Sequence, residues 1–312
     1  MTTVEPQGQL DERSRPRSWR VLAAAYISLM KLRVIELLLV TTLPAMVLAA
    51  RGVPPLGLVL VTLLAGTLAA GSAHAFNQVL ERDIDAVMRR TQRRPVVSAT
   101  VSPVGAAVFA GVLLAAAVLL MLLFVNPLAA ALTALANVFY VVVYTLLLKR
   151  RTSQNIVWGG IAGCLPTMIG WAAVTGSLAL EPVLLFLIVF FWTPPHYWPL
   201  AMRFRDDYER AGVPMLPVVA SPATVARQIL GYSWAMVVTT LVLWRVAELG
   251  WLYLFTAVLA GVWFLTEAHR LYRRAKSDAT GSALRAMRLF HGSITYLTVV
   301  FAAVALDVLL VT

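Results

Sequence analysis

The sequence predicts an all-α membrane protein that crosses the bilayer nine times, with a cytoplasmic N-terminus and an outside C-terminus. Of its 312 residues, 60% are hydrophobic and 13% are charged, whereas soluble domains are about 45–50% apolar. The hydrophobic residues also fall in runs of about 20, the length that a helix needs to cross a bilayer. This composition excludes a disordered chain and an ordinary soluble enzyme. The single Cys164 excludes an internal disulfide.

Nine apolar segments are expected to form the spanning helices, because backbone polar groups inside a bilayer must be satisfied within the helix. Each segment ends at a break that contains proline, glycine or charged residues. The segments are 34–50, 55–76, 102–124, 127–148, 155–175, 182–200, 225–244, 250–268 and 291–311. Residues 1–18 are polar, and we expect a flexible cytoplasmic arm there, followed by a single transmembrane domain over residues 19–312.

The basic residues set the predicted orientation. With the N-terminus inside, 24 of the 26 Lys and Arg residues lie on the cytoplasmic side, and only Arg51 and Arg245 lie outside. This sorting explains most of the formal net charge of +11, since basic loops are attracted to anionic lipid headgroups. The chain carries no zinc-finger or RNA-binding motif, so no nucleic-acid partner is expected.

The loop after the second segment carries the first candidate site. If the helix continues into this loop, Asn77, Glu81 and Asp85 are spaced four residues apart and share one face. Such a row of oxygen ligands suits Mg²⁺, which uses a few carboxylates together with substrate phosphates. Asp83 lies on another face and is a secondary candidate. The alternative interpretation is a polar loop whose acids simply pair with neighbouring arginines.

A second acidic loop follows the sixth segment and contains Asp206 and Asp207. Four spans separate the two loops, so both lie on the same side of the membrane. Two such loops could bind two metal ions around one diphosphate, with flanking arginines such as Arg210 adding charge. We therefore predict a phosphate-bearing headgroup at the rim and an apolar tail among the helices. A solvated interface is the alternative for this loop.

His196 follows Pro194 and Pro195 near the end of the sixth segment. The two prolines predict a broken helix at membrane depth. An ionisable residue at such a break indicates function, such as acid–base chemistry. The alternative is an interfacial histidine without a chemical role.

Four motifs, taken in order, resemble one known family. They are Asn77-x3-Glu81-Arg82-Asp83-Ile84-Asp85-x2-Met88-x-Arg90-Thr91, Tyr144-Thr145-x3-Lys149-Arg150-x-Thr152, Trp192-Thr193-Pro194-Pro195-His196-Tyr197-Trp198, and Asp207-Tyr208-x2-Ala211-Gly212-x-Pro214-Met215-Leu216-Pro217. The set resembles the intramembrane prenyltransferases of the UbiA superfamily, and more narrowly the branch that farnesylates protohaem IX. The resemblance covers about residues 26–311. The chain departs from the superfamily pattern at Asp206 and Asp207, which are adjacent instead of four residues apart.

The resemblance implies transfer of a farnesyl group from farnesyl diphosphate to a vinyl group of haem b (protohaem IX), giving haem O and diphosphate, with Mg²⁺ as the cofactor. It implies that metal and diphosphate are held by Asn77, Glu81, Asp85 and Asp207, with Asp83 and Asp206 as secondary metal ligands. The expected diphosphate-binding cations are Arg33, Arg90, Lys149 and Arg150, and the expected haem contact is His196.

The same resemblance implies a setting for the reaction. We expect a bacterial inner membrane with the active site on the cytoplasmic side, and a haem A synthase or an oxidase-assembly protein as a partner. Two alternatives stay open. One is an aromatic-acid prenyltransferase of quinone synthesis, from the same superfamily. The other is a polytopic transporter, whose acids should lie near the middle of the membrane instead of at its rim.

Overall fold

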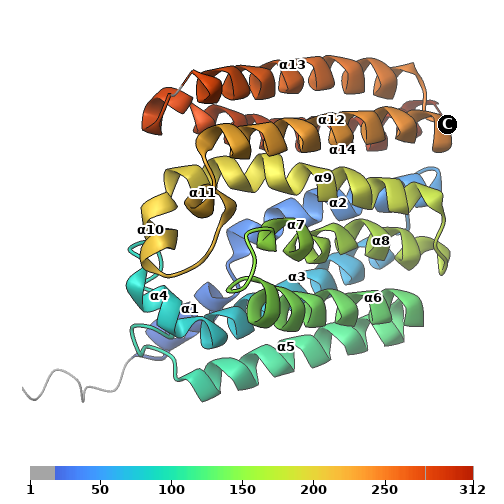
Figure 1. Cartoon of the computed structure of the whole chain (residues 1–312). Coiled ribbons are helices and arrows are strands. Elements are labelled where there is room, and N and C mark those ends of the chain that lie inside the picture. Colours follow the sequence, from blue (N-terminus) through green and yellow to red (C-terminus); the bar gives the residue numbers. More distant parts are fainter. Residues whose placement is uncertain (1–17, 278, 312) are drawn as a thin grey trace, which may run out of the picture.

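The computed structural model describes residues 18–277 and 279–311, and for residues 33–39 and 311 it describes the backbone alone. Within this part of the chain every regular element is helical, as the sequence predicts. The long helices run side by side, with α5 on one side of the bundle and α12, α13 and α14 on the other (Figure 1).

Eight helical segments are long and apolar enough to cross a membrane, and they coincide with eight of the expected spans. They are α3 (Leu56–Leu80), α5 (Pro103–Phe124), α6 with the π-helix η1 (Pro127–Val138, Phe139–Leu148), α7 with α8 (Asn155–Gly159, Ile161–Thr175), α9 (Leu180–Arg203), α12 (Pro222–Val246), α13 (Trp251–Lys276), and η2 with α14 (Gly281–Leu284, Ala286–Val311). α2 (Leu32–Ala50) stands where the first span is expected. The count of nine spans and the outside C-terminus stay predictions.

A short helix, α1 (Trp19–Leu29), precedes α2 and was not assigned from the sequence. Its 11 residues are too few to cross a bilayer. Ala25 and Leu29 pack against Ala75 of α3 and Ala106 of α5, while Trp19 is exposed. The expected flexible arm lies almost entirely outside the described residues.

The expected break in the sixth span is wrong. α9 is one continuous helix through Pro194, Pro195 and Pro199. All three prolines are buried, so neighbouring segments enclose the helix there. Within α9, the Thr193 hydroxyl donates a hydrogen bond to the Val189 carbonyl at 2.9 Å. Packing of this kind lets membrane helices tolerate proline.

Short helices gather at one end of the bundle. They are α4 (Arg82–Val87), α10 (Arg205–Arg210) and α11 (Leu216–Val219), and α14 ends at the opposite end (Figure 1). At that opposite end Arg51 donates to the Ala247 carbonyl at 2.7 Å. Asp307 accepts hydrogen bonds from the backbone N–H groups of Gly250 and Tyr253, and so caps the start of α13. The two acidic loops therefore share one end.

Candidate active site

The acidic row begins where α3 ends. Asn77, Glu81 and Asp85 are each at most 2% exposed. α3 ends and α4 begins on either side of Glu81. The Glu81 N–H donates to the Asn77 carbonyl at 2.9 Å, and the Asp85 N–H donates to the Glu81 carbonyl at 2.8 Å. These i to i+4 bonds preserve the helical spacing across the junction with α4, so the three side chains stay in one row.

Two cations face this row. Lys149 Nζ lies 2.5 Å from Glu81 Oε2, and Arg94 Nη1 lies 2.5 Å from Asp85 Oδ2. Both carboxylates are nearly inaccessible, whereas each cation keeps about a sixth of its surface exposed. A charge-assisted pair at this distance holds both partners in a fixed geometry. Each carboxylate near the junction of α3 and α4 thus faces a cation, one from the end of η1 and one from the loop after α4.

The π-helix η1 positions Lys149. The backbone N–H of Lys149 donates to the Tyr144 carbonyl, five residues back, at 2.9 Å, and the Thr145 side-chain hydroxyl donates to the Tyr140 carbonyl at 3.0 Å. Asn77 in turn donates from Nδ2 to Thr145 Oγ1 at 3.3 Å. π-helical turns occur often at functional sites because they re-aim side chains. Here the wider turn directs Thr145 and Lys149 toward α3.

Tyr144 fits against a glycine of α7. A Cβ atom added to Gly159 would lie 2.1 Å from Tyr144 Cδ2, closer than two carbon atoms can approach. Gly159 therefore lets the tyrosine ring pack directly on the α7 backbone. A larger residue at position 159 would push this ring away.

Two buried oxygen atoms, one in the row and one beside it, are available to a ligand. Glu81 Oε1 and Gln78 Oε1 are enclosed and have no hydrogen-bond partner among the described residues. An unpartnered buried carboxylate oxygen is costly unless something binds it. Hard oxygen donors of this kind fit Mg²⁺. Three carboxylate, imidazole or thiol groups close enough to hold one ion are not found in the described part of the chain.

Asp83 and Arg150 lie on a different face. Arg150 donates to both oxygens of Asp83 at 2.7 Å, and both side chains are largely exposed. The guanidinium hydrogen bonds lower the pKa of Asp83, and the carboxylate raises the pKa of Arg150. This pair therefore stands outside the buried row, as a forked surface ion pair.

The two acidic loops together line one pocket. A pocket of about 560 Å³ is lined by Arg89 and Arg90 from the first loop and by Arg203, Phe204, Asp206, Asp207 and Arg210 from the second. Asp207 is buried and pairs with Arg210, while Asp206 is exposed. Four arginines around two carboxylates leave an excess of positive charge, which suits an anionic group.

An apolar cluster holds the two loops together. Ile84 and Met88 of the first loop pack with Tyr208 and Met215 of the second. Tyr197 of α9 packs against this cluster, and burial raises the pKa of the Tyr208 phenol. The structure thus brings the two loops side by side.

His196 lies on α9 next to this cluster. Its ring is stacked between Trp192 and Phe290, and its Nδ1 lies 2.8 Å from the Ser293 hydroxyl. Trp192 belongs to α9 itself, whereas Phe290 and Ser293 come from α14, which sequence reasoning did not connect with the site.

Lys31 is a functional candidate that sequence reasoning missed. It lies between α1 and α2 with a left-handed backbone, φ 52°. Desolvation by the surrounding helices, and then the charges of Arg94 and Lys149, lower the pKa of Lys31 to about 7. Its place beside Arg33 in the sequence could have indicated it. The side chain of Arg33 lies outside the described residues.

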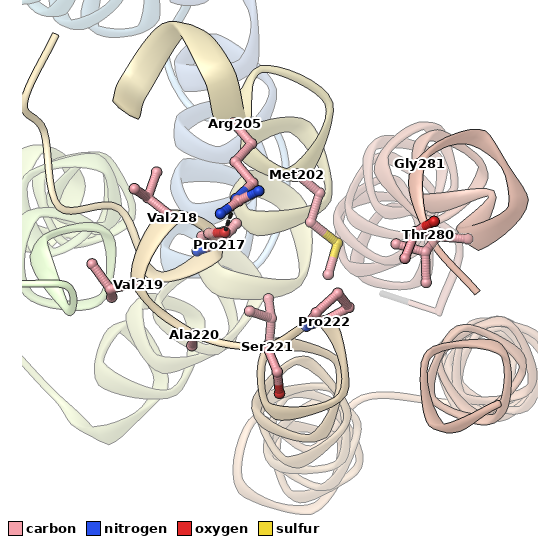
Figure 2. A pocket seen from close by; sticks show the side chains of 12 residues that line it. Met202, Arg205, Pro217, Val218, Val219, Ala220, Ser221, Pro222, Thr280 and Gly281 are labelled. Atoms are coloured by element: carbon pink, nitrogen blue, oxygen red, sulfur yellow. Dashed lines mark hydrogen bonds between the residues drawn. The ribbon is translucent and has the colours of Figure 1, made fainter. Parts of the chain in front are cut away.

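A second pocket, of about 510 Å³, opens at the same end of the bundle (Figure 2). Met202, Arg205, Pro217 and Thr280 are among its lining residues, and Arg205 is bound to the Pro217 carbonyl at 3.1 Å. Among the described residues of this lining, Arg205 is the charged one. None of the predicted site residues whose side chains the structure describes lines it, so it is distinct from the pocket between the acidic loops, although Arg205 of α10 borders it.

Known proteins resemble the chain over nearly its whole length. A sequence model described as the UbiA prenyltransferase family matches residues 38–294. Protoheme IX farnesyltransferases of Streptomyces avermitilis and Frankia alni are 56% and 58% identical to it. The first alignment covers 98% of both chains, and the second covers 90% of this chain and 96% of the relative.

Solved structures show the same fold. A digeranylgeranylglyceryl phosphate synthase superposes with a TM-score of 0.76 at 14% identity, covering 92% of this chain and 98% of the other. A UbiA homolog from Archaeoglobus fulgidus bound to GPP and Mg²⁺ gives a TM-score of 0.60 at 17% identity, covering 90% and 99%. At these identities the similarity establishes the arrangement of helices.

Proposed function

The chain belongs to the UbiA prenyltransferase family, and we propose that it transfers the farnesyl group of farnesyl diphosphate to a vinyl group of haem b, forming haem O and diphosphate. The observation that carries this proposal is the buried row of Asn77, Glu81 and Asp85 with Lys149 and Arg94 facing it. It lies at one end of an apolar bundle, as a diphosphate headgroup with a long apolar tail requires. The similarity to protoheme IX farnesyltransferases supports haem as the acceptor.

Binding comes first in the proposed mechanism. Lys31, Lys149 and Arg94 would contact diphosphate oxygens from the row, and Arg90 would do so from the neighbouring pocket. Arg33 stays a predicted contact. Arg150 also stays a predicted contact, but it is paired with Asp83 at the surface, outside the buried row. These cations stabilise the charge that grows on the diphosphate as the carbon–oxygen bond breaks.

Mg²⁺ fits the oxygen donors of this site. Asn77, Glu81 and Asp85 would hold it from the row and Asp207 from the second loop, with Asp83 and Asp206 at the exposed rim. The free Glu81 Oε1 is the donor best prepared for it. When bound, Mg²⁺ supplies further neutralisation of the diphosphate. The surrounding apolar helices exclude bulk water from the allylic carbon.

The haem acceptor is proposed to bind on the α9 side of the site. His196 is the candidate haem contact, because it is the partly exposed polar side chain in an otherwise aromatic surrounding. A partner that takes the product onward, such as a haem A synthase or an oxidase-assembly protein, stays a prediction.

Product analysis tests the proposal directly. Purified protein in membranes receives farnesyl diphosphate, Mg²⁺ and either haem b or para-hydroxybenzoate, and mass spectrometry identifies the farnesylated product. We expect product with haem b alone. Product only with the aromatic acid would favour the quinone-synthesis alternative. No covalent product with either acceptor, from a protein that moves haem across vesicles, would favour the transporter.

We further propose that the site faces the cytoplasm of a bacterial inner membrane, because 24 of the 26 basic residues lie on that side in the predicted topology. The one native cysteine, Cys164, is buried, so a cysteine added at exposed Glu209 can be labelled selectively. A membrane-impermeant maleimide should label Glu209→Cys in lysed cells but not in intact ones. Equal labelling in intact cells would reverse the orientation.

A further inference from the structure

We propose that Ser293 is a positioning residue: it fixes the tautomer and the plane of the His196 imidazole so that the Nε2 lone pair coordinates the iron of the haem substrate. This inference rests on the proposed function, because it takes haem b as the acceptor. Ser293 lies on α14, 97 residues from His196 in the sequence.

Two aromatic rings hold the imidazole plane. Trp192 stacks on one face of His196, with ring centroids 4.1 Å apart and planes 14° apart. Phe290 stacks on the other face at 4.7 Å and 26°. Trp192 is itself anchored, because its Nε1–H donates to the Ser293 carbonyl at 2.7 Å. The imidazole therefore cannot tilt without disturbing both α9 and α14.

The hydroxyl of Ser293 determines the tautomer. It donates its only proton to the Phe290 carbonyl at 2.6 Å. Its oxygen also lies 2.8 Å from His196 Nδ1, and a hydroxyl that has already donated can only accept there. His196 Nδ1 must therefore carry the hydrogen. In the neutral imidazole the lone pair is then on Nε2.

Nε2 is available to a ligand. It makes no hydrogen bond with any described residue, and it is not among the buried unpartnered atoms, so the protein does not enclose it. His196 is partly exposed, whereas Ser293 is completely buried. A histidine that serves packing alone has no need for one ring nitrogen held rigidly and the other left open.

The arrangement is the one that metal-binding histidines use. Such a residue donates its second ring N–H to a fixed acceptor, which orients the ring and sets the tautomer. The next residue on α9, Tyr197, packs against the apolar cluster that joins the two acidic loops. A porphyrin bound at His196 would thus lie beside the site proposed for the prenyl diphosphate. The iron of the haem is the metal that this geometry points to.

Porphyrin binding without farnesyl diphosphate tests the inference apart from turnover. Full-length protein in nanodiscs is titrated with haem b and with metal-free protoporphyrin IX, and absorption spectra are recorded. In the unmodified protein we expect a histidine-ligated haem spectrum and tighter binding of the iron porphyrin. In His196→Ala the spectrum and the preference for iron should both be lost.

Ser293→Ala separates positioning from ligation. It keeps the imidazole but removes its acceptor, so haem affinity should fall about 10- to 100-fold, with protoporphyrin binding unchanged. Ser293→Thr retains the hydroxyl and should restore the affinity. In Ser293→Cys the thiol is a weak acceptor, so this variant should weaken haem binding as Ser293→Ala does. It can be used in place of Ser293→Ala if Ser293→Ala does not fold. Ser233→Ala is the matched control, since that buried hydroxyl bonds only within α12, to the Ile229 carbonyl at 2.8 Å.

Two results would overturn the inference. One is an unchanged haem spectrum and iron preference in His196→Ala. The other is unchanged haem affinity in Ser293→Ala and Ser293→Cys. A protein that farnesylates haem b but shows no iron preference would overturn this inference alone. A protein that makes no farnesylated haem, while still ligating haem through His196, would overturn the proposed function and leave the ligation standing.

Discussion

Lys149 Nζ lies 2.5 Å from Glu81 Oε2, although 68 residues separate them in the chain. The pair joins the end of η1 to the junction of α3 and α4. Burying two charges is costly, and the attraction between them offsets this cost only while both are present. Removing either charge alone should therefore destabilise the site.

Lys149→Met should destabilise the protein by about 3–5 kcal/mol, because it leaves the buried Glu81 carboxylate uncompensated. The double variant Glu81→Gln with Lys149→Met should recover most of that stability. It should remain inactive, since it lacks both a metal ligand and a diphosphate contact. Thermal unfolding in detergent and product formation in membranes measure the two effects separately. A double variant with substantial activity would contradict the roles proposed for this pair.

Asp85→Asn should lower turnover about 100-fold or more, because it removes a negative charge from the proposed Mg²⁺ site. It should also raise the Mg²⁺ concentration needed for half-maximal activity. EDTA should abolish the activity of the unmodified protein, and added Mg²⁺ should restore it. Glu209→Gln, an exposed acid of α10, is the control. Equal Mg²⁺ requirements in Asp85→Asn and the unmodified protein would show that Asp85 does not bind the metal.

Gly159→Ala should reduce both stability and activity, because the added Cβ would lie 2.1 Å from Tyr144 Cδ2. Overpacking of this kind costs about 1–3 kcal/mol, and moving Tyr144 disturbs the turn that carries Lys149. Gly163→Ala is the matched control, since nothing lies within 4 Å of its added Cβ. Unfolding temperatures and initial rates of both variants provide the comparison. A control as impaired as Gly159→Ala would remove the steric explanation.

Asp307→Ala should destabilise the fold by about 1–3 kcal/mol, since the buried N–H groups of Gly250 and Tyr253 lose their acceptor. Asp307→Asn keeps one acceptor oxygen and should cost less. The activity of the folded fraction should not change, because Asp307 lies at the end of the bundle opposite the acidic loops. An activity loss larger than the folded fraction explains would link that end to the reaction.

Properties that depend on local sequence could be predicted. Eight spans coincide with the helices because length and hydropathy decide them without long-range contacts. The row of Asn77, Glu81 and Asp85 follows from the helical period alone. The expected break at Pro194 and Pro195 was wrong for the opposite reason. Whether a proline interrupts a membrane helix depends on the helices packed around it, and the sequence does not show these.

A polytopic helical protein, two acidic loops at one end and the residues that mark its family could all be predicted from local sequence. Which charges meet depends on how the helices pack. The tertiary structure buried Glu81 and Asp85 against Lys149 and Arg94, left Asp83 with Arg150 at the surface, and brought Lys31 to the row. It also placed Ser293 behind His196. The length of an apolar segment and the spacing of residues on a helix depend on about twenty consecutive residues. These contacts, in contrast, join segments that are far apart in the chain and that only packing brings together.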